Sequence, residues 1–144
     1  MEIIKAKLTD LQQIEPIFNL YRSFYGEEKN TEATLEFLEQ RIKKNESMIL
    51  FAKENEEILG FVQIFNSFSS ATLSRTFILN DLYVIESARN RGIASALIAK
   101  VLEQAKMDNC SRVSLSTAKN NPAKKLYEKI GFRESKFKFY NYVL

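Results

Sequence analysis

Residues 79–97 combine a short apolar run, a basic loop and the start of an amphipathic helix. Arg89 and Arg91 lie in the loop, and Gly92 stands directly before the helix. The first-turn N–H groups of a helix have no acceptor within the helix, and the helix dipole adds about half a positive charge at that end. A glycine there lets a phosphate approach the backbone closely. The spacing therefore predicts a phosphate site at this turn.

The chain has no histidine and one cysteine, Cys110. This excludes Ser-His and Cys-His nucleophilic triads, an intrachain disulfide, Cys-based metal sites and the usual zinc sites. A catalytic base must then be a carboxylate, a tyrosine, a lysine or a water molecule. We expect no metal.

Length and composition are those of an ordinary globular protein. The chain has 144 residues, 45% of them hydrophobic and 27% charged, which predicts one domain over residues 1–144. No apolar run approaches the roughly 20 residues that a membrane span needs. The N-terminus lacks the basic and apolar regions of a signal peptide. We therefore expect a cytoplasmic protein with no membrane partner.

The net charge of +3 is unevenly distributed. Residues 1–85 contain 9 basic and 13 acidic residues, whereas residues 86–133 contain 10 basic and 4 acidic ones. No motif for binding RNA or DNA accompanies the basic half, so we expect no nucleic-acid partner. A basic half suits a phosphorylated cofactor and an acidic half suits a cationic substrate, although scattered surface charge explains the asymmetry equally well.

Apolar periodicity and turn residues predict an ordered series of elements. Strands are expected at 3–7, 48–52, 58–65, 76–84, 113–117 and 137–143, with turns at 54–57 and 66–70. Helices are expected from about residue 10 to residue 26, from residue 31 past residue 42, and at 92–107 and 122–130. Antiparallel strands followed by βαβ units indicate an α+β fold with a mixed, mostly antiparallel central sheet flanked by helices.

Local signals refine the helices. Thr9 is the expected N-cap of the first helix, and Pro16 is expected to delay its start or kink it. The second helix is expected to turn Leu35, Phe37, Leu38 and Ile42 inward. Gly131 is the expected C-cap of the last helix.

The spacing Arg89-x-x-Gly92-x-Ala94 resembles the pyrophosphate loop (Q/R-x-x-G-x-G/A) of the GCN5-related N-acetyltransferases, the GNAT family. Residues 120–132, NNPAKKLYEKIGF, resemble the segment that ends the catalytic core of that family. The order of predicted elements matches the family's acyl-CoA N-acyltransferase fold from end to end. The resemblance implies a small bacterial-type N-acetyltransferase with acetyl-CoA as co-substrate.

The resemblance also assigns roles in holding the cofactor. The main chain of the strand before the loop would pair with the pantetheine arm, the amides of the loop and first helical turn would hold the pyrophosphate near the Arg89 side chain, and Asn120 would contact the arm. Ala94 replaces the commoner second glycine. The assigned residues are Leu82, Tyr83, Val84, Arg89, Asn90, Arg91, Gly92, Ile93, Ala94, Ser95, Asn120 and Tyr127.

Tyr127 matches the tyrosine that protonates the departing thiolate. A phenol titrates near pH ~10, close to an alkyl thiol, so this transfer is nearly isoenergetic. Many relatives carry a glutamate base where this chain has Asn80, which cannot act as a base. The base is then Asp81, acting through water, or one of the residues outside this strand, Glu27, Glu28 or Tyr25. A structural role for Asp81 stays open.

The resemblance implies that the acceptor site is walled by the loop between the first two helices and by the C-terminal strands. The predicted acceptor residues are Tyr25, Glu27, Glu28 and Asn80. Phe137, Phe139 and Tyr140 would wall the same site or form a homodimer face. The predicted function is direct acetyl transfer to a primary amine of a small molecule in a ternary complex. A peptide or protein acetyltransferase, and a non-catalytic acyl-CoA sensor or interaction module, are the alternatives.

Overall fold

A computed structural model describes all residues, 1–144. It contains a five-stranded sheet with the order β1-β2-β3-β4-β5, in which only β5 runs parallel to its neighbour. This confirms the predicted α+β fold with a mixed, mostly antiparallel sheet. The strands are β1 (Glu2–Lys5), β2 (Ser47–Glu54), β3 (Glu57–Ser69), β4 (Ser74–Val84) and β5 (Arg112–Ser114). The helices are α1 (Leu11–Phe24), α2 (Thr31–Lys43), α3 (Ile93–Met107) and α4 (Ala123–Ile130).

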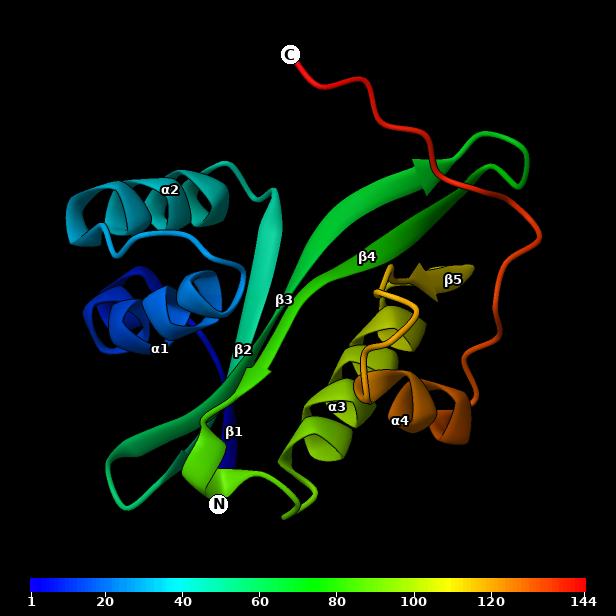
Figure 1. Ribbon diagram of the computed structural model, residues 1–144. Helices are drawn as coiled ribbons and strands as arrows, with labels where there is room; N and C mark the ends of the chain where they lie inside the picture. Colours follow the sequence, from blue (N-terminus) through cyan, green and yellow to red (C-terminus); the bar gives the residue numbers. More distant parts are fainter.

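The helices cover both faces of the sheet, with α1 and α2 on one face and α3 and α4 on the other (Figure 1). Each face has its own hydrophobic core. Ile14, Leu38 and Phe61 are fully buried in the core under α1 and α2, and Leu97 and Ile98 are fully buried in the core under α3. None of the helices is both long and apolar enough to cross a membrane.

The start of α1 differs from the prediction. A 3-10 turn, η1 (Leu8–Asp10), precedes the helix, and Asp10 accepts a hydrogen bond of 2.8 Å from the backbone N–H of Lys7. Thr9 is therefore not the N-cap of α1; Asp10 holds that position, and its carboxylate makes no cap hydrogen bond to α1. The predicted late start is also wrong, since α1 begins at Leu11 and continues through Pro16.

α2 begins at Thr31 as predicted, with Asn30 as its N-cap. The Asn30 side chain accepts from the backbone N–H of Ala33 at 3.0 Å. The inward face differs from the prediction at one position, because Phe37 is 41% exposed while Thr34 is buried. The side chain of Thr34 donates to Asn19 of α1 at 3.2 Å, so a polar contact holds part of the face between the two helices.

β2 and β3 form the predicted hairpin. Its two turn residues, Asn55 and Glu56, both have positive φ (49° and 65°), which matches the twist of a tight hairpin. The predicted turn at 66–70 is wrong, because β3 continues to Ser69 and the connection to β4 occupies residues 70–73. These residues remain in a strand because they pair with β4, from Asn66 opposite Phe77 to Ser69 opposite Ser74.

A β-bulge interrupts the pairing of β3 and β4. Gln63 faces Asp81 and the next residue, Ile64, faces Leu79, so Asn80 is an extra residue in β4. Side chains alternate between the two faces of a regular strand, and one extra residue shifts this alternation. The bulge therefore changes which residues of β4 face each helical layer.

The shift is visible in the burial of β4. Leu79 before the bulge and Leu82 after it both pack into the core under α3, although they are three residues apart. A regular strand would place Asp81 in that core together with Leu79. The bulge instead turns Asp81 to the opposite face, toward α1 and α2, where Asn80 also lies.

The C-terminal part of the sheet is shorter than predicted. β5 ends at Ser114, and the predicted strand at 137–143 is wrong, because no residue after α4 pairs with the sheet. Figure 1 shows this terminal segment, coloured red, as an irregular tail. Its aromatic residues stay exposed, with Phe137 at 89% and Tyr142 at 90%. The alternation in this segment is strand-like, but a strand also requires a partner. Its role in a dimer stays a prediction.

Candidate active site

The loop before α3 presents a series of unbonded backbone donors. Gly92 caps the helix with φ 78°, and Asn90 also has positive φ, 63°. The first N–H that bonds to this turn belongs to Ala96, which donates to the carbonyl of Gly92 at 3.0 Å. The N–H groups of residues 90–95 have no acceptor within the chain. Such consecutive free donors at the N-terminus of a helix form an anion cradle.

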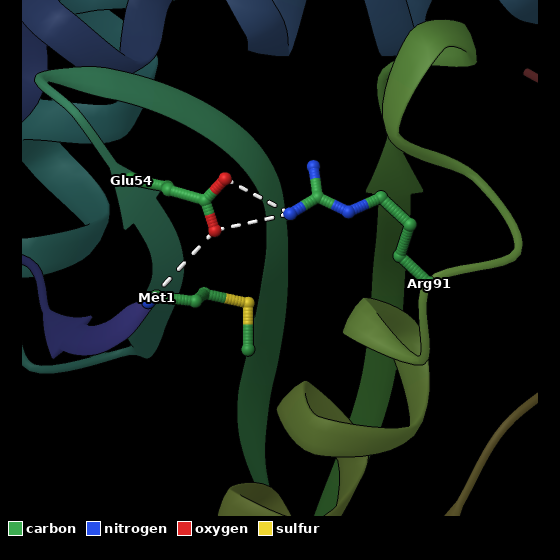
Figure 2. A network of polar contacts seen from close by, with 3 residues as sticks. All are labelled: Met1, Glu54 and Arg91. Carbon is green, nitrogen blue, oxygen red and sulfur yellow. Dashed lines mark hydrogen bonds and ion pairs between the residues drawn. The ribbon is translucent and has the colours of Figure 1, made fainter.

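Arg91 points away from this cradle and pairs with Glu54 at the end of β2 (Figure 2). One guanidinium nitrogen donates to both carboxylate oxygens, at 2.9 and 3.0 Å. The N-terminal ammonium of Met1 lies 3.8 Å from the same carboxylate. The pKa of Glu54 is lowered, first by the hydrogen bond from Arg91 and then by its charge. The loop is thus attached to the β2–β3 hairpin.

Arg89 is also bound within the chain. Its Nε donates to the carbonyl of Val84 at 3.0 Å, and its guanidinium lies 5.6 Å from the centre of the Tyr83 ring. Arg89 and Arg91, both predicted to contact the cofactor, are therefore bound within the protein in this structure. The free donors of the loop are its backbone amides and the remaining guanidinium N–H groups.

The edge of β4 beside the loop is open. β5 pairs only with Thr76, Phe77 and Ile78, so residues 79–84 have no partner on that side (Figure 1). Because main-chain groups alternate in direction along a strand, Leu82 and Val84 turn theirs to this free edge. An extended polar chain could pair with them there. This is where the resemblance places the pantetheine arm.

Gly60 determines how closely β3 approaches this part of β4. A Cβ at Gly60 would lie 2.9 Å from the carbonyl oxygen of Tyr83 and 3.1 Å from a methyl group of Val84. A side chain at residue 60 would displace the strand end whose main chain borders the free edge.

A cavity of about 420 Å³ lies on the other face of the sheet, between β3, β4 and the first two helices. Gln63 and Asp81 of the sheet line it, and Arg22 of α1 is the only cationic residue in its wall. The complete lining is Phe18, Arg22, Ala33, Thr34, Phe37, Gln63, Phe65, Asn80 and Asp81. The cavity thus brings together two of the sequence-predicted residues, Asn80 and Asp81.

Asp81 is 4% exposed and is held by neighbouring donors. Gln63 Nε2 donates to Oδ2 at 2.5 Å, and Asn80 Nδ2 donates to Oδ1 at 2.9 Å. The phenol of Tyr21 is a third donor. A buried carboxylate with fixed donors and an adjoining cavity is a suitable position for a general base. Asn80 supports the carboxylate but has no basic group of its own.

Two tyrosines of this region, Tyr21 and Tyr127, have raised pKa values. Burial raises the pKa of Tyr21, and the Asp81 hydrogen bond and charge raise it further, with smaller effects from Tyr25 and Tyr127. Burial also raises the pKa of Tyr127, and Tyr25 adds to this. The mutual influence indicates that these phenols converge on one region, although they come from α1, its C-terminal end and α4. Tyr127 is buried against Phe132, with ring centres 6.0 Å apart.

The raised pKa of Tyr21 predicts a specific loss of stability in alkali. Above about pH 10 the unfolded chain releases this proton while the folded chain retains it, so stability falls as the pH rises. Tyr21→Phe is expected to reduce the fall in Tm between about pH 9 and pH 11. Thermal melts at several pH values measure this. Tyr140→Phe, at a residue 89% exposed, is the control and leaves the slope unchanged. Equal slopes for Tyr21→Phe and the unsubstituted protein would contradict the prediction.

The remaining predicted residues lie at the periphery. Glu27 and Glu28 are exposed and are absent from the cavity wall. Their hydrogen bonds are made by the backbone: the N–H of Glu27 donates to the carbonyl of Arg22 at 3.0 Å, and the carbonyl of Glu28 accepts from the Arg22 side chain at 2.6 Å. Tyr25 is 62% exposed, and its ring packs against that of Tyr21 in a tilted arrangement, with the ring centres 5.1 Å apart. Asn120 is exposed in the turn before α4.

Asn121, not Asn120, makes the local turn before α4. Its side chain accepts from the N–H of Ala123 at 3.0 Å. Gly131 is the C-cap of α4 as predicted, with φ 126°. No group of histidine, cysteine, aspartate and glutamate residues in the structure is arranged to hold a metal ion.

Sequence reasoning missed Gln63 and Tyr21 as site residues. Gln63 is a polar residue in an otherwise apolar strand run, LGFVQIF, and this was the available signal. Tyr21 lies on the apolar face of α1, with its ring centre 5.7 Å from the ring centre of Phe61. Its hydroxyl group reaches beyond that face to Asp81.

Comparisons with known proteins point in one direction. The model of the acetyltransferase (GNAT) family matches residues 14–132. The uncharacterized N-acetyltransferase YhfO of Bacillus subtilis (strain 168) is 38% identical over 135 residues, which are 93% of this chain and 91% of that protein. A crystal structure of a probable acetyltransferase has a TM-score of 0.94 and 41% identity, and the match covers 100% of this chain and 98% of the other.

A more distant structure shares only the fold. It is a predicted acetyltransferase from Clostridium acetobutylicum, solved with acetyl-CoA, with a TM-score of 0.79 and 20% identity. The match covers 97% of this chain and 95% of the other.

Proposed function

The chain belongs to the GNAT family of acetyltransferases, and from this we propose that it transfers an acetyl group from acetyl-CoA to a primary amine of a small molecule. The transfer proceeds by direct attack of the amine within a ternary complex. The observation that carries the proposal is the buried Asp81 carboxylate, which borders a cavity on one face of β4. On the same strand, the next residues lead to the open edge and the anion cradle.

The residues present fit acetyl-CoA. The free N–H groups of residues 90–95 suit the pyrophosphate, and the open strand edge at Leu82 and Val84, where the carbonyl of Val84 accepts from Arg89, suits the amide-containing arm. Arg89 and Arg91 add positive charge to the loop, although each is already paired within the chain. The fit rests mainly on backbone groups, among them that of Gly92, where a side chain would be strained.

Acetyl-CoA supplies an acetyl group activated as a thioester when it is bound. A primary ammonium must lose two protons to become an amide N–H. Asp81 accepts the first proton, directly or through water, which frees the nitrogen lone pair to form the N–C bond. Tyr127 donates its phenolic proton to the departing sulfur as the C–S bond breaks, and the second nitrogen proton restores the phenol. Burial raises the pKa of Tyr127 and so favours its neutral, protonated form, in which the phenol can donate a proton at neutral pH.

An acyl-cysteine route is disfavoured by the position of Cys110. The next residue, Ser111, donates to the carbonyl of Arg75 at 2.9 Å, so Cys110 lies near the start of β4. Asp81 is six residues further along the strand, about 20 Å away at ~3.3 Å per residue. Burial also raises the pKa of the Cys110 thiol, which reduces its nucleophilic thiolate form.

An amine panel tests the proposal. Loss of the thioester absorbance of acetyl-CoA is followed with small primary amines, with peptides bearing a free N-terminus or lysine, and with no acceptor. We expect turnover with small amines, and the same turnover in Cys110→Ala. Preference for peptides would favour a peptide or protein acetyltransferase. Tight acetyl-CoA binding without turnover on any amine would favour a non-catalytic sensor.

Glu54 provides a further test of the cradle. It neutralises Arg91 and places negative charge near the phosphate loop (Figure 2). Glu54→Gln is expected to raise acetyl-CoA affinity by about 2- to 5-fold at low salt, because it removes a negative surface charge near the phosphate loop. The gain should vanish at high salt through screening. Calorimetric titration at two salt concentrations measures it. Glu46→Gln, which loses a surface pair with Arg41 on the other end of β2, is the control. A lower affinity for Glu54→Gln would mean that the pair orders the loop.

A further inference from the structure

Gln63 is a fully buried polar residue whose amide is only half satisfied. It is 0% exposed, and its Nε2 donates to Asp81 Oδ2. Its Oε1 is buried and has no hydrogen-bond partner. A buried acceptor without a partner is unusual and requires an explanation.

The orientation of this amide follows from its neighbour. An ionised carboxylate only accepts hydrogen bonds, so Gln63 must direct its NH₂ group to Asp81. The carbonyl oxygen then points elsewhere and stays available to a donor. Gln63 and Asp81 are cross-strand partners on the same face of the sheet, and both line the cavity. A residue of the cavity wall therefore has an unpaired, buried carbonyl oxygen beside a carboxylate.

We propose that Gln63 and Asp81 together bind the ammonium group of the acceptor, and that Gln63 selects primary amines over more substituted ones. This rests on the proposed function. A primary ammonium has three N–H donors, enough to serve Gln63 Oε1 and an Asp81 oxygen together. A tertiary ammonium has one and can serve only one of them. Binding also places the amine beside the carboxylate that takes its proton.

The rest of the cavity wall suits the carbon part of an amine, because most of its residues are uncharged. Arg22, the one cation there, is held by the side chain of Asn19 at 3.1 Å and by the carbonyl of Glu28. Phe18, Phe37 and Phe65 provide apolar wall for the carbon part of the acceptor. Besides Arg22 and Asp81, no residue of the lining carries a charge.

Binding without catalysis tests this inference separately from the proposed function. Benzylamine and N,N-dimethylbenzylamine are both cations of similar size at neutral pH, but they differ in the number of N–H donors. Titrations in the absence of acetyl-CoA, followed by calorimetry or NMR, give the two Kd values. We expect benzylamine to bind at least about 10-fold more tightly, the effect of losing one charge-assisted hydrogen bond.

Gln63→Met removes the amide while keeping the length of the side chain. The preference for benzylamine is expected to fall below about 3-fold, so that less than 1 kcal/mol of discrimination remains. With acetyl-CoA present, the KM for the amine should rise about 10-fold or more, while the acetyl-CoA Kd stays unchanged. Asn80→Ala is the matched control. It also removes a donor to Asp81, but Asn80, unlike Gln63, has no buried acceptor without a partner.

Each outcome has one meaning. Loss of the primary-amine preference in Gln63→Met but not in Asn80→Ala supports the inference. Equal effects of the two substitutions would mean that Gln63 only orients Asp81, and retention of the preference in Gln63→Met would overturn the inference outright. Binding with the expected preference but no turnover on any amine would leave this inference standing while the proposed enzymatic function fails. If Gln63→Met unfolds, Gln63→Leu replaces it.

Discussion

Gly92→Asp is expected to weaken acetyl-CoA binding by at least about 100-fold, equivalent to roughly 2.7 kcal/mol. The substitution places a carboxylate next to the free N–H groups of residues 90–95, where phosphate oxygens should bind. Two like charges about 4 Å apart repel by about 4 kcal/mol at an effective dielectric constant near 20. The new carboxylate also competes for the donors themselves.

Gly92→Asn separates this charge effect from backbone strain. Gly92 has φ 78°, so any side chain there is strained, but aspartate and asparagine both tolerate this region better than most residues. They have nearly the same shape and differ in charge. We expect Gly92→Asn to bind acetyl-CoA within about 10-fold of the parent, a cost of up to roughly 1.4 kcal/mol. Calorimetric titration measures both, with thermal melts to establish folding. Equal losses in the two variants would show that the loop does not hold phosphate.

Asp81→Asn is expected to lower kcat by about 10²- to 10³-fold, the usual contribution of a positioned general base. Asparagine preserves the shape of the side chain, and its carbonyl oxygen can still accept from one of the donors that now face Asp81. The fold should therefore survive. The acetyl-CoA Kd should be unchanged, because the side chain of Asp81 turns to the face opposite the α3 core and its main-chain groups turn to β3, away from the free edge.

Asn80→Ala is the control for this prediction. It removes one hydrogen bond to the carboxylate but not the carboxylate, so we expect kcat to fall by less than about 5-fold, or roughly 1 kcal/mol. Steady-state kinetics with the best amine of the panel, together with calorimetry for acetyl-CoA, measure both variants. A kcat for Asp81→Asn within a few-fold of the parent would assign the base to another residue or to a water relay.

The parts of the site that could be predicted from the sequence are local ones. The phosphate loop depends on a glycine directly before an amphipathic helix, and both lie within a few consecutive residues. The position of Gly92 as N-cap and of Gly131 as C-cap follows from the same short-range rules. These signals involve no partner far away in the chain.

The parts that were missed depend on pairing between distant residues. Gln63 meets Asp81 across 18 residues of chain, and the meeting depends on a bulge that no local residue pattern indicated. The strand predicted at 137–143 failed for a related reason. Its aromatic alternation describes a suitable strand but provides no partner edge, and none is formed.

The extra residue in β4 also affects how this protein should be compared with others one position at a time. A one-residue deletion at Asn80 would restore regular alternation without moving Asp81 to another face, because Leu79 and Leu82 would then be two residues apart on the α3 face with Asp81 between them. Two homologues can thus keep a carboxylate at the same point in space while their sequences place it one residue apart. In a sequence alignment, the position of Asn80 therefore describes the path of the backbone. The catalytic carboxylate must be identified by the face of the sheet on which it lies, toward α1 and α2. Elsewhere in this strand, a one-residue insertion or deletion would exchange the faces of the residues beyond it, which makes it far more damaging than a deletion at Asn80.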